Sequence, residues 1–114
     1  MLTWRRMTGV LPEPTREVEP LNGLDSLASA FGSLRGDDEV KRFLRDLCTL
    51  PELEALVHRW QTVQLLDEGV AYLEIAERVP TSTATVTRVA QWLRHGTGGY
   101  RIALARVHAK RKRG

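Results

Sequence analysis

The chain has 114 residues, of which 42% are hydrophobic and 6% aromatic, which is enough apolar material for one small core. No apolar run approaches the roughly 18 residues that a membrane span needs, and the single Cys48 excludes an internal disulfide. The first residues, MLTWRRMTGV, lack the apolar segment of a signal peptide, so we expect a cytoplasmic protein with a reduced thiol.

The net charge of +3 conceals an asymmetry along the chain. Residues 1–69 contain 8 Lys and Arg against 12 Asp and Glu, whereas residues 70–114 contain 9 against 2. The second part therefore carries a net charge of +7, which would attract the phosphate backbone of a nucleic acid. A merely solvated basic surface is the alternative.

Residues 1–22 are predicted to form a flexible arm. They contain Pro12, Pro14 and Pro20, mixed charges and no hydrophobic periodicity. Trp4 and the neighbouring Arg5 and Arg6 are candidates for contact with DNA or a partner, but a disordered leader is the favoured interpretation.

Two amphipathic helices are predicted after the arm. In residues 24–34 apolar side chains recur at i, i+3, i+4 and i+7, the spacing of one helical face. Gly36 is expected to end this helix, and Asp37 or Asp38 to cap the next one. The second helix would carry its apolar face on Val40, Phe43, Leu44 and Leu47.

A third, longer helix is predicted from Pro51 to about Glu68, because proline suits the first turn of a helix and Gly69 can end it. Its apolar side chains cover more than one face, at Leu53, Leu56, Val57, Trp60, Val63, Leu65 and Leu66. One small domain can hardly cover such a surface, so we expect part of it to meet a second subunit.

Residues 72–93, YLEIAERVPTSTATVTRVAQWL, have the layout of a helix-turn-helix DNA reader. Ala76 would allow the close approach of the two helices. The side chains expected to be buried are Ile75 and Val79 of the first helix and Val86, Val89 and Leu93 of the second. Pro80 stands in the turn, where many such motifs have glycine, so Thr81 or Ser82 must build the turn by capping.

The second helix, residues 82–95, opens with short polar side chains that let a helix enter the major groove. Hydroxyls can meet base edges or phosphates, and alanine or threonine methyls can contact thymine methyls. The candidate DNA-contacting residues are Thr81, Ser82, Thr83, Ala84, Thr85, Thr87 and Arg88. An ordinary helical hairpin with a capping serine is the structural alternative.

A glycine-rich break at Gly96–Gly99 is followed by a last predicted helix, at about Tyr100–Ala109. The all-helical domain would thus cover residues 23–109, with a basic tail at residues 110–114. This tail either grips phosphates or is a solvated end.

No constellation of catalytic residues is recognisable, so we do not expect an enzyme, a cofactor or a metal site. His58, His95 and His108 lack metal-ligand spacing, and Cys48 has no base near it in sequence. Two alternatives to a DNA-binding regulator stay open. One is a dimeric adaptor that docks a protein through Trp60 and Trp92, and the other is an accessory DNA-end reader of a mobile element.

The chain resembles the Trp repressor superfamily, and more closely its YerC/YecD branch. The resemblance covers about Asp37–Leu104 and rests on the segments LPELEALVHRWQTVQLLDEG, STATVTRV and LRHGTGGYRIAL. It implies an all-α, six-helix fold that forms an intertwined homodimer with one helix-turn-helix at each end. The implied function is that of a transcriptional repressor bound to double-stranded DNA.

The resemblance also implies a candidate effector pocket. The superfamily's known ligand, L-tryptophan, is gripped by a threonine and two arginines, which match Thr49, Arg59 and Arg88 here. Val89 and Trp92 stand where the repressor has glycine and serine, and both add bulk where the ligand would lie. We therefore expect no response to tryptophan, with Trp92 filling the pocket. Operator preference should also differ, since the first helix of the motif offers tyrosine and leucine where the repressor has basic and polar groups.

Overall fold

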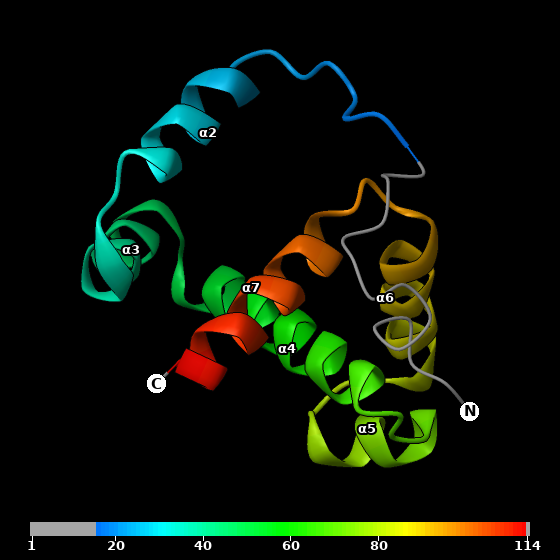
Figure 1. The fold of residues 1–114 in the computed structure, drawn as a ribbon. Helices are drawn as coiled ribbons and strands as arrows, with labels where there is room; N and C mark the ends of the chain where they lie inside the picture. Colours follow the sequence, from blue (N-terminus) through cyan, green and yellow to red (C-terminus); the bar gives the residue numbers. More distant parts are fainter. Residues whose placement is uncertain (1–15, 114) are drawn as a thin grey trace. The chain divides into compact units, whose positions relative to one another are not determined.

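A computed structural model describes residues 16–113, which fold into α-helices joined by turns and short coil segments (Figure 1). The all-α class and the six helices predicted from the sequence are confirmed in this range. The helices are α2 (Leu24–Gly32), α3 (Gly36–Leu47), α4 (Leu50–Asp67), α5 (Tyr72–Arg78), α6 (Thr83–His95) and α7 (Gly99–Arg113).

The described chain divides into two compact units within helix α4. The N-terminal unit is Val18–Val57, and the C-terminal unit begins at His58 and includes residues 16 and 17. The prediction that residues 23–109 form one domain stays a prediction. Most of the predicted arm, residues 1–15, lies outside the described residues, together with Trp4, Arg5 and Arg6.

The N-terminal unit has apolar helix faces but no enclosed core. The Phe31 and Phe43 rings meet edge to face with their centroids 5.0 Å apart. Yet neither α2 nor α3 contains a buried residue. Leu47 and Leu56 of this unit are 49% and 41% exposed. The unit therefore displays the apolar surface that the helical periodicity predicted.

The predicted junction between α2 and α3 is wrong in detail. Helix α2 ends at Gly32, where the Ser33 hydroxyl donates a hydrogen bond of 2.7 Å to the carbonyl of Ala30. Helix α3 begins at Gly36 with Arg35 as its N-cap, so neither Asp37 nor Asp38 caps it. Instead the Glu39 carboxylate accepts a hydrogen bond of 2.8 Å from the Arg35 amide, which starts the helix earlier than predicted. 

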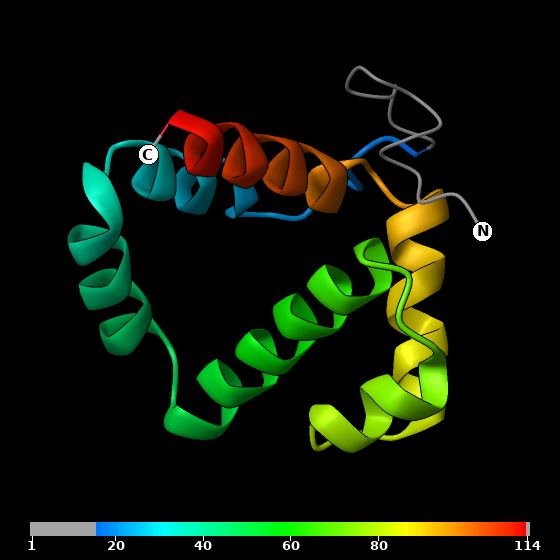
Figure 2. The same cartoon turned by 60° about the horizontal axis from the view of Figure 1, so that its bottom comes forward.

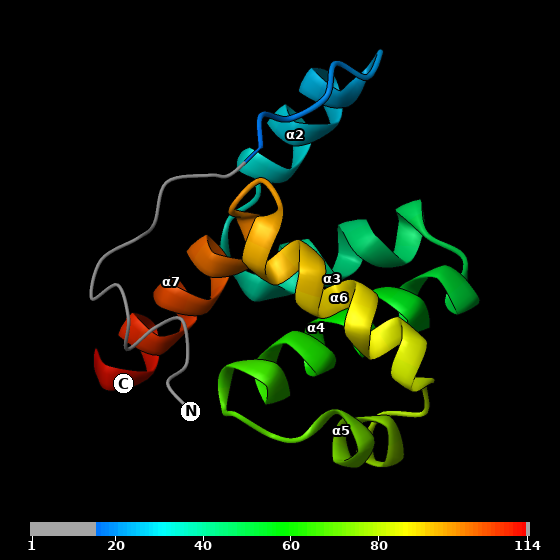
Figure 3. The ribbon, with the colours of Figure 1, turned by 90° about the vertical axis from the view of Figure 1, so that its right-hand side faces the viewer.

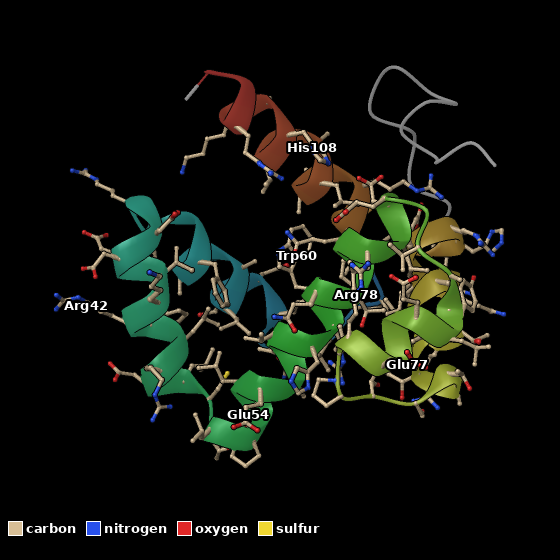
Figure 4. The ribbon with its side chains drawn as sticks, turned by 90° about the horizontal axis from the view of Figure 1, so that it is seen from below. Arg42, Glu54, Trp60, Glu77, Arg78 and His108 are labelled. Atoms are coloured by element: carbon tan, nitrogen blue, oxygen red, sulfur yellow. The ribbon has the colours of Figure 1, made fainter. Side chains whose placement is uncertain are left out.

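The C-terminal unit contains two buried clusters that share helix α4. In the first, Trp60 (labelled in Figure 4), Leu66 and Tyr100 pack around the buried side chains of Val63, Val89, Leu93 and Leu104. The second consists of Ile75, Val79 and Val86, with Leu65, Leu66, Val70, Tyr72 and Ala76 against it. The predicted inward faces of the two motif helices are thus confirmed, and α4 supplies the surface on which both rest.

Two predicted helix ends can be compared with the structure. At the end of α4, the Gly69 amide bonds to the Leu66 carbonyl at 3.0 Å and the Val70 amide to the Leu65 carbonyl at 3.1 Å. Gly69 has a φ of +85°, so this is a Schellman motif that needs glycine. Helix α7, in contrast, continues past Ala109 to Arg113, because arginine and lysine are good helix formers and suit the negative end of the helix dipole.

Candidate DNA interface

Helices α5 and α6 follow one another in the chain and are joined by one short turn (Figure 3). Ile75 and Val86 are completely buried between them, and Val79 is 3% exposed. Each helix contributes to the same buried cluster, so the pair is held as one unit on the C-terminal part of α4. This is the geometry of a helix-turn-helix.

The turn at Pro80 is completed by a serine cap. Among the described residues only glycines have positive φ, so the turn contains no left-handed residue. Ser82 is the N-cap of α6, and its hydroxyl oxygen accepts a hydrogen bond of 3.1 Å from the Thr85 amide. The expectation that Thr81 or Ser82 builds the turn is therefore confirmed for Ser82.

Most of the candidate DNA-contacting side chains lie on the exposed face of the first turns of α6. Ser82, Thr83, Ala84, Thr87 and Arg88 are exposed, whereas Thr81 and Thr85 are half-buried. The opposite face of the helix is buried at Val86, Val89, Ala90 and Leu93. The Thr87 hydroxyl donates a hydrogen bond of 3.0 Å to the Thr83 carbonyl, which leaves its oxygen free only as an acceptor.

The charges around this face suit an anionic ligand. Helix α6 has no acidic residue in its first turn, so the positive end of its dipole is not neutralised there. In α5 an ion pair joins Arg78 to Glu74, and Glu77 beside it is exposed (Figure 4). Helix α5 thus carries a net charge of −1, which the net charge of +2 from Arg88 and Arg94 of α6 outweighs.

Comparison with known proteins decides the family. The family model described as Trp repressor protein matches residues 22–108. This chain belongs to the Trp repressor family. Membership indicates a DNA-binding regulator, since the family consists of regulators and not of enzymes.

Individual relatives of this Trp repressor family member agree with that placement. An uncharacterized protein, YerC, of Bacillus subtilis is 38% identical over 93 residues, which is 80% of this chain and 89% of that protein. A crystal structure of a candidate Trp repressor from Staphylococcus aureus has a TM-score of 0.72 at 32% identity, covering 78% of this chain and 89% of the other. A TrpR-like protein from Eubacterium eligens has a TM-score of 0.71 at 35% identity, with 77% and 91% covered.

Thr49, one of the candidate effector residues of this Trp repressor family member, has a structural role at the start of α4. Its amide donates a hydrogen bond of 2.8 Å to the Glu52 carboxylate, and its hydroxyl accepts one of 3.3 Å from the Glu52 amide. This reciprocal pair is a capping box. The bonds to Thr49 lower the pKa of Glu52 below its usual value of 4.5, despite a small opposing effect of burial.

The two candidate arginines and Val89 lie in the C-terminal unit. Arg59 and Arg88 are exposed, whereas Val89 is 6% exposed in the cluster with Val63 and Leu104. Burial raises the pKa of Tyr100, and the nearby charge of Arg59 lowers it in part. The structure thus associates Arg59 with a tyrosine that the sequence did not single out.

Trp92 is placed differently from the expectation that it fills a pocket. Its side chain is 46% exposed, and the Arg16 guanidinium carbon lies 4.7 Å from the centre of its ring. This is the geometry of a cation–π contact. Of the two bulky residues expected to exclude tryptophan, Val89 is therefore buried within the described single chain, whereas the Trp92 side chain is partly exposed to solvent.

The sequence did not predict the contacts that three residues make near the motif. Arg94 donates a hydrogen bond of 3.1 Å to the Tyr72 hydroxyl, and Arg101 bonds to carbonyls at the end of α6. Nothing in the local sequence signals these contacts, because the partners belong to different helices. Among residues 16–113, no group of three metal-binding side chains gathers, and no helix is long and apolar enough to cross a membrane.

Proposed function

We propose that this protein is a homodimeric, sequence-specific DNA-binding regulator that reads the major groove with the N-terminal half of α6. The observation that supports this most is the row of exposed short side chains and one cation, Thr83, Ala84, Thr87 and Arg88, opposite the buried face of the helix. Short side chains let the helix backbone approach the base edges. The family description favours a repressor, which acts by occupying its operator.

The roles of these residues are expected to differ. Thr83, in the first turn, would contact base edges and influence which sequence is bound. Arg88, one turn further on, would contact a phosphate and contribute similarly to every sequence. Thr87 can accept but not donate a hydrogen bond in this conformation, so its replacement by valine should cost less than the loss of Arg88.

The decisive experiment is a salt titration of DNA affinity after selection of bound sequences from random duplexes. If Arg88 contacts a phosphate, Arg88→Ala should lower the slope of log affinity against log salt by about 1. Arg42→Ala is the matched control, since Arg42 lies on α3 in an exposed ion pair with Asp38. Thr83→Ala should change the selected sequence, and unchanged affinity and preference in this variant would contradict groove entry by α6.

The homodimer is supported by uncovered apolar surface. The helices α2 and α3 bury no residue, and Leu50, Leu56 and Val57 of α4 are 55%, 41% and 45% exposed. A second copy of the chain offers the same apolar faces in return, as an isologous interface requires. Sedimentation at micromolar concentration should give twice the chain mass, and a species of 12.9 kDa would contradict the dimer. Leu56→Asp should unfold the chain, because the interface is also the core.

A second candidate function is a dimeric adaptor that binds a protein. Of the two predicted docking residues, Trp60 packs against the buried cluster of Val63 and Leu104, whereas Trp92 is 46% exposed. Leu73 of α5 is 73% exposed, so apolar side chains remain on the surface of the motif. The same titration separates the two functions, since the adaptor predicts no duplex binding even at low salt.

The regulator is further proposed to act without tryptophan. Val89 already fills space in the buried cluster beside Arg88, and Trp92 adds an indole one turn away on the same helix. The indole of a bound tryptophan would have to fit beside these side chains, and overfilling a packed site is unfavourable. This is why we propose that the protein does not need tryptophan.

A further inference from the structure

The end of α6 lacks the usual glycine cap. Helices commonly end with a left-handed residue whose amides satisfy the last carbonyls. Here Gly96 follows α6 in an extended conformation, with φ −85° and ψ −154°, and its amide donates a hydrogen bond of 2.9 Å to the Trp92 carbonyl. A Cβ atom at position 96 would collide with that carbonyl and lie 2.9 Å from Trp92 Cε3. Position 96 therefore requires glycine.

Arg101 takes the place of the missing cap. Its Nε donates a hydrogen bond of 2.8 Å to the Leu93 carbonyl, and its Nη2 bonds to the Arg94 carbonyl. The planar guanidinium presents several donors in a fixed fork, so one side chain can serve two carbonyls. Its positive charge also lies at the negative end of the helix dipole. Figure 2 shows the short loop after α6 that lets α7 return to this position.

The same turn of α6 is also bound by α5. The Nη2 of Arg94 donates a hydrogen bond of 3.1 Å to the hydroxyl of Tyr72, 22 residues earlier in the chain. Arg94 therefore contacts α5 through its side chain and α7 through its carbonyl. We call Tyr72, Arg94 and Arg101 the α6 clamp.

We propose that Arg101 is a positioning residue that sets the direction of α6 for DNA recognition. The proposal rests on the proposed DNA-binding function. Helix α6 has 13 residues and is about 20 Å long, so a small tilt at its clamped end displaces Thr83 at the other end. Arg101 itself does not have to touch DNA.

The test compares Arg101→Ala and Arg101→Lys with Arg106→Ala, an exposed arginine of the same helix. Arg101→Ala should lower affinity for the selected duplex by about tenfold, equivalent to about 1.4 kcal/mol, and affinity for random duplex much less. The salt slope should stay that of the unaltered protein. A slope lower by about 1, with equal losses on both duplexes, would make Arg101 a phosphate contact and overturn the proposal. Lysine keeps the charge but not the fork, so Arg101→Lys should lose selectivity without a change in slope.

A second measurement uses the unaltered protein without DNA and covers the case in which Arg101→Ala does not fold. The Arg101 Nε–H is engaged with a carbonyl, so its hydrogen exchange by NMR should be slower than that of Arg106 Nε–H. Equal exchange rates would overturn the clamp. If the exchange is slow but the protein binds no duplex at low salt, the DNA-binding function fails, and with it the positioning role, while the clamp itself stands as a structural contact.

Discussion

The Nε2 atom of His108 lies 3.0 Å from Oδ2 of Asp67, 41 residues earlier in the chain. Asp67 is the last residue of α4 and is 1% exposed, and His108 approaches it from α7 (Figure 4). A buried carboxylate is costly unless it is hydrogen-bonded. The pair therefore attaches α7 to the end of the helix on which the motif rests.

Removing the imidazole should destabilise the C-terminal unit. We expect His108→Ala to lower the free energy of unfolding by about 1–3 kcal/mol, because the buried Asp67 loses a hydrogen-bond donor. His108→Gln can still donate and should lose less. Urea denaturation followed by circular dichroism measures both, with His95→Ala, an exposed histidine at the end of α6, as the control. Equal effects of the two alanine variants would show that the pair adds no stability.

The cap of α6 can be separated from its contact with DNA. Ser82→Ala removes the acceptor for the Thr85 amide and should cost about 1 kcal/mol of stability. Ser82→Asp keeps a good cap and suits the helix dipole, so its melting temperature should match that of the unaltered protein. Its carboxylate would nevertheless face the phosphates, so DNA affinity should fall. An aspartate variant that binds DNA normally would remove Ser82 from the interface.

The capping box of α4 should make stability depend on pH. The Thr49 bonds hold the pKa of Glu52 below 4.5 in the folded chain, so folding favours the carboxylate. This stabilisation is complete above the unfolded pKa and is lost as the pH falls through the lower folded value. The melting temperature of Glu52→Ala should therefore differ from that of the unaltered protein near neutral pH more than in acid. Glu54→Ala, which removes another exposed carboxylate from α4, is the matched control.

L-Tryptophan should have no effect on this family member. Even one extra methylene in a packed site costs roughly 1–3 kcal/mol, and an indole next to the buried Val89 needs far more space. We expect millimolar tryptophan to change neither the melting temperature nor DNA affinity. Val89→Gly combined with Trp92→Ser should lower stability, because the loss of the buried Val89 side chain opens a cavity. It is the variant in which an indole-like ligand could bind weakly. Saturable micromolar binding to the unaltered protein in isothermal titration would restore the corepressor role.

The elements that sequence reasoning predicted correctly depend on local periodicity. The burial of Ile75, Val79, Val86 and Leu93 is predictable because a helix returns to the same face every three to four residues, whatever the rest of the chain does. The serine cap after Pro80 was predictable for the same reason, since donor and acceptor are three residues apart. The family resemblance came from such local segments as well.

The predictions at element ends were less accurate, because several side chains compete for the same amides. At the start of α3, Glu39 bonds back to Arg35, while Asp38 pairs with Arg42 at 2.8 Å. The sequence is compatible both with this arrangement and with the predicted one, in which Asp37 or Asp38 caps the helix. Small differences in free energy select one, and composition does not reveal them.

The sequence by itself determined the helices, the helix-turn-helix arrangement and which face of α6 is exposed. Only the tertiary structure decided how that motif is held: Arg94 bonds to Tyr72 across 22 residues, and His108 to Asp67 across 41. It also decided that Trp92 stays half-exposed beside Arg16. A hydrogen bond between helices depends on where packing places both backbones, and that placement is a property of the whole core.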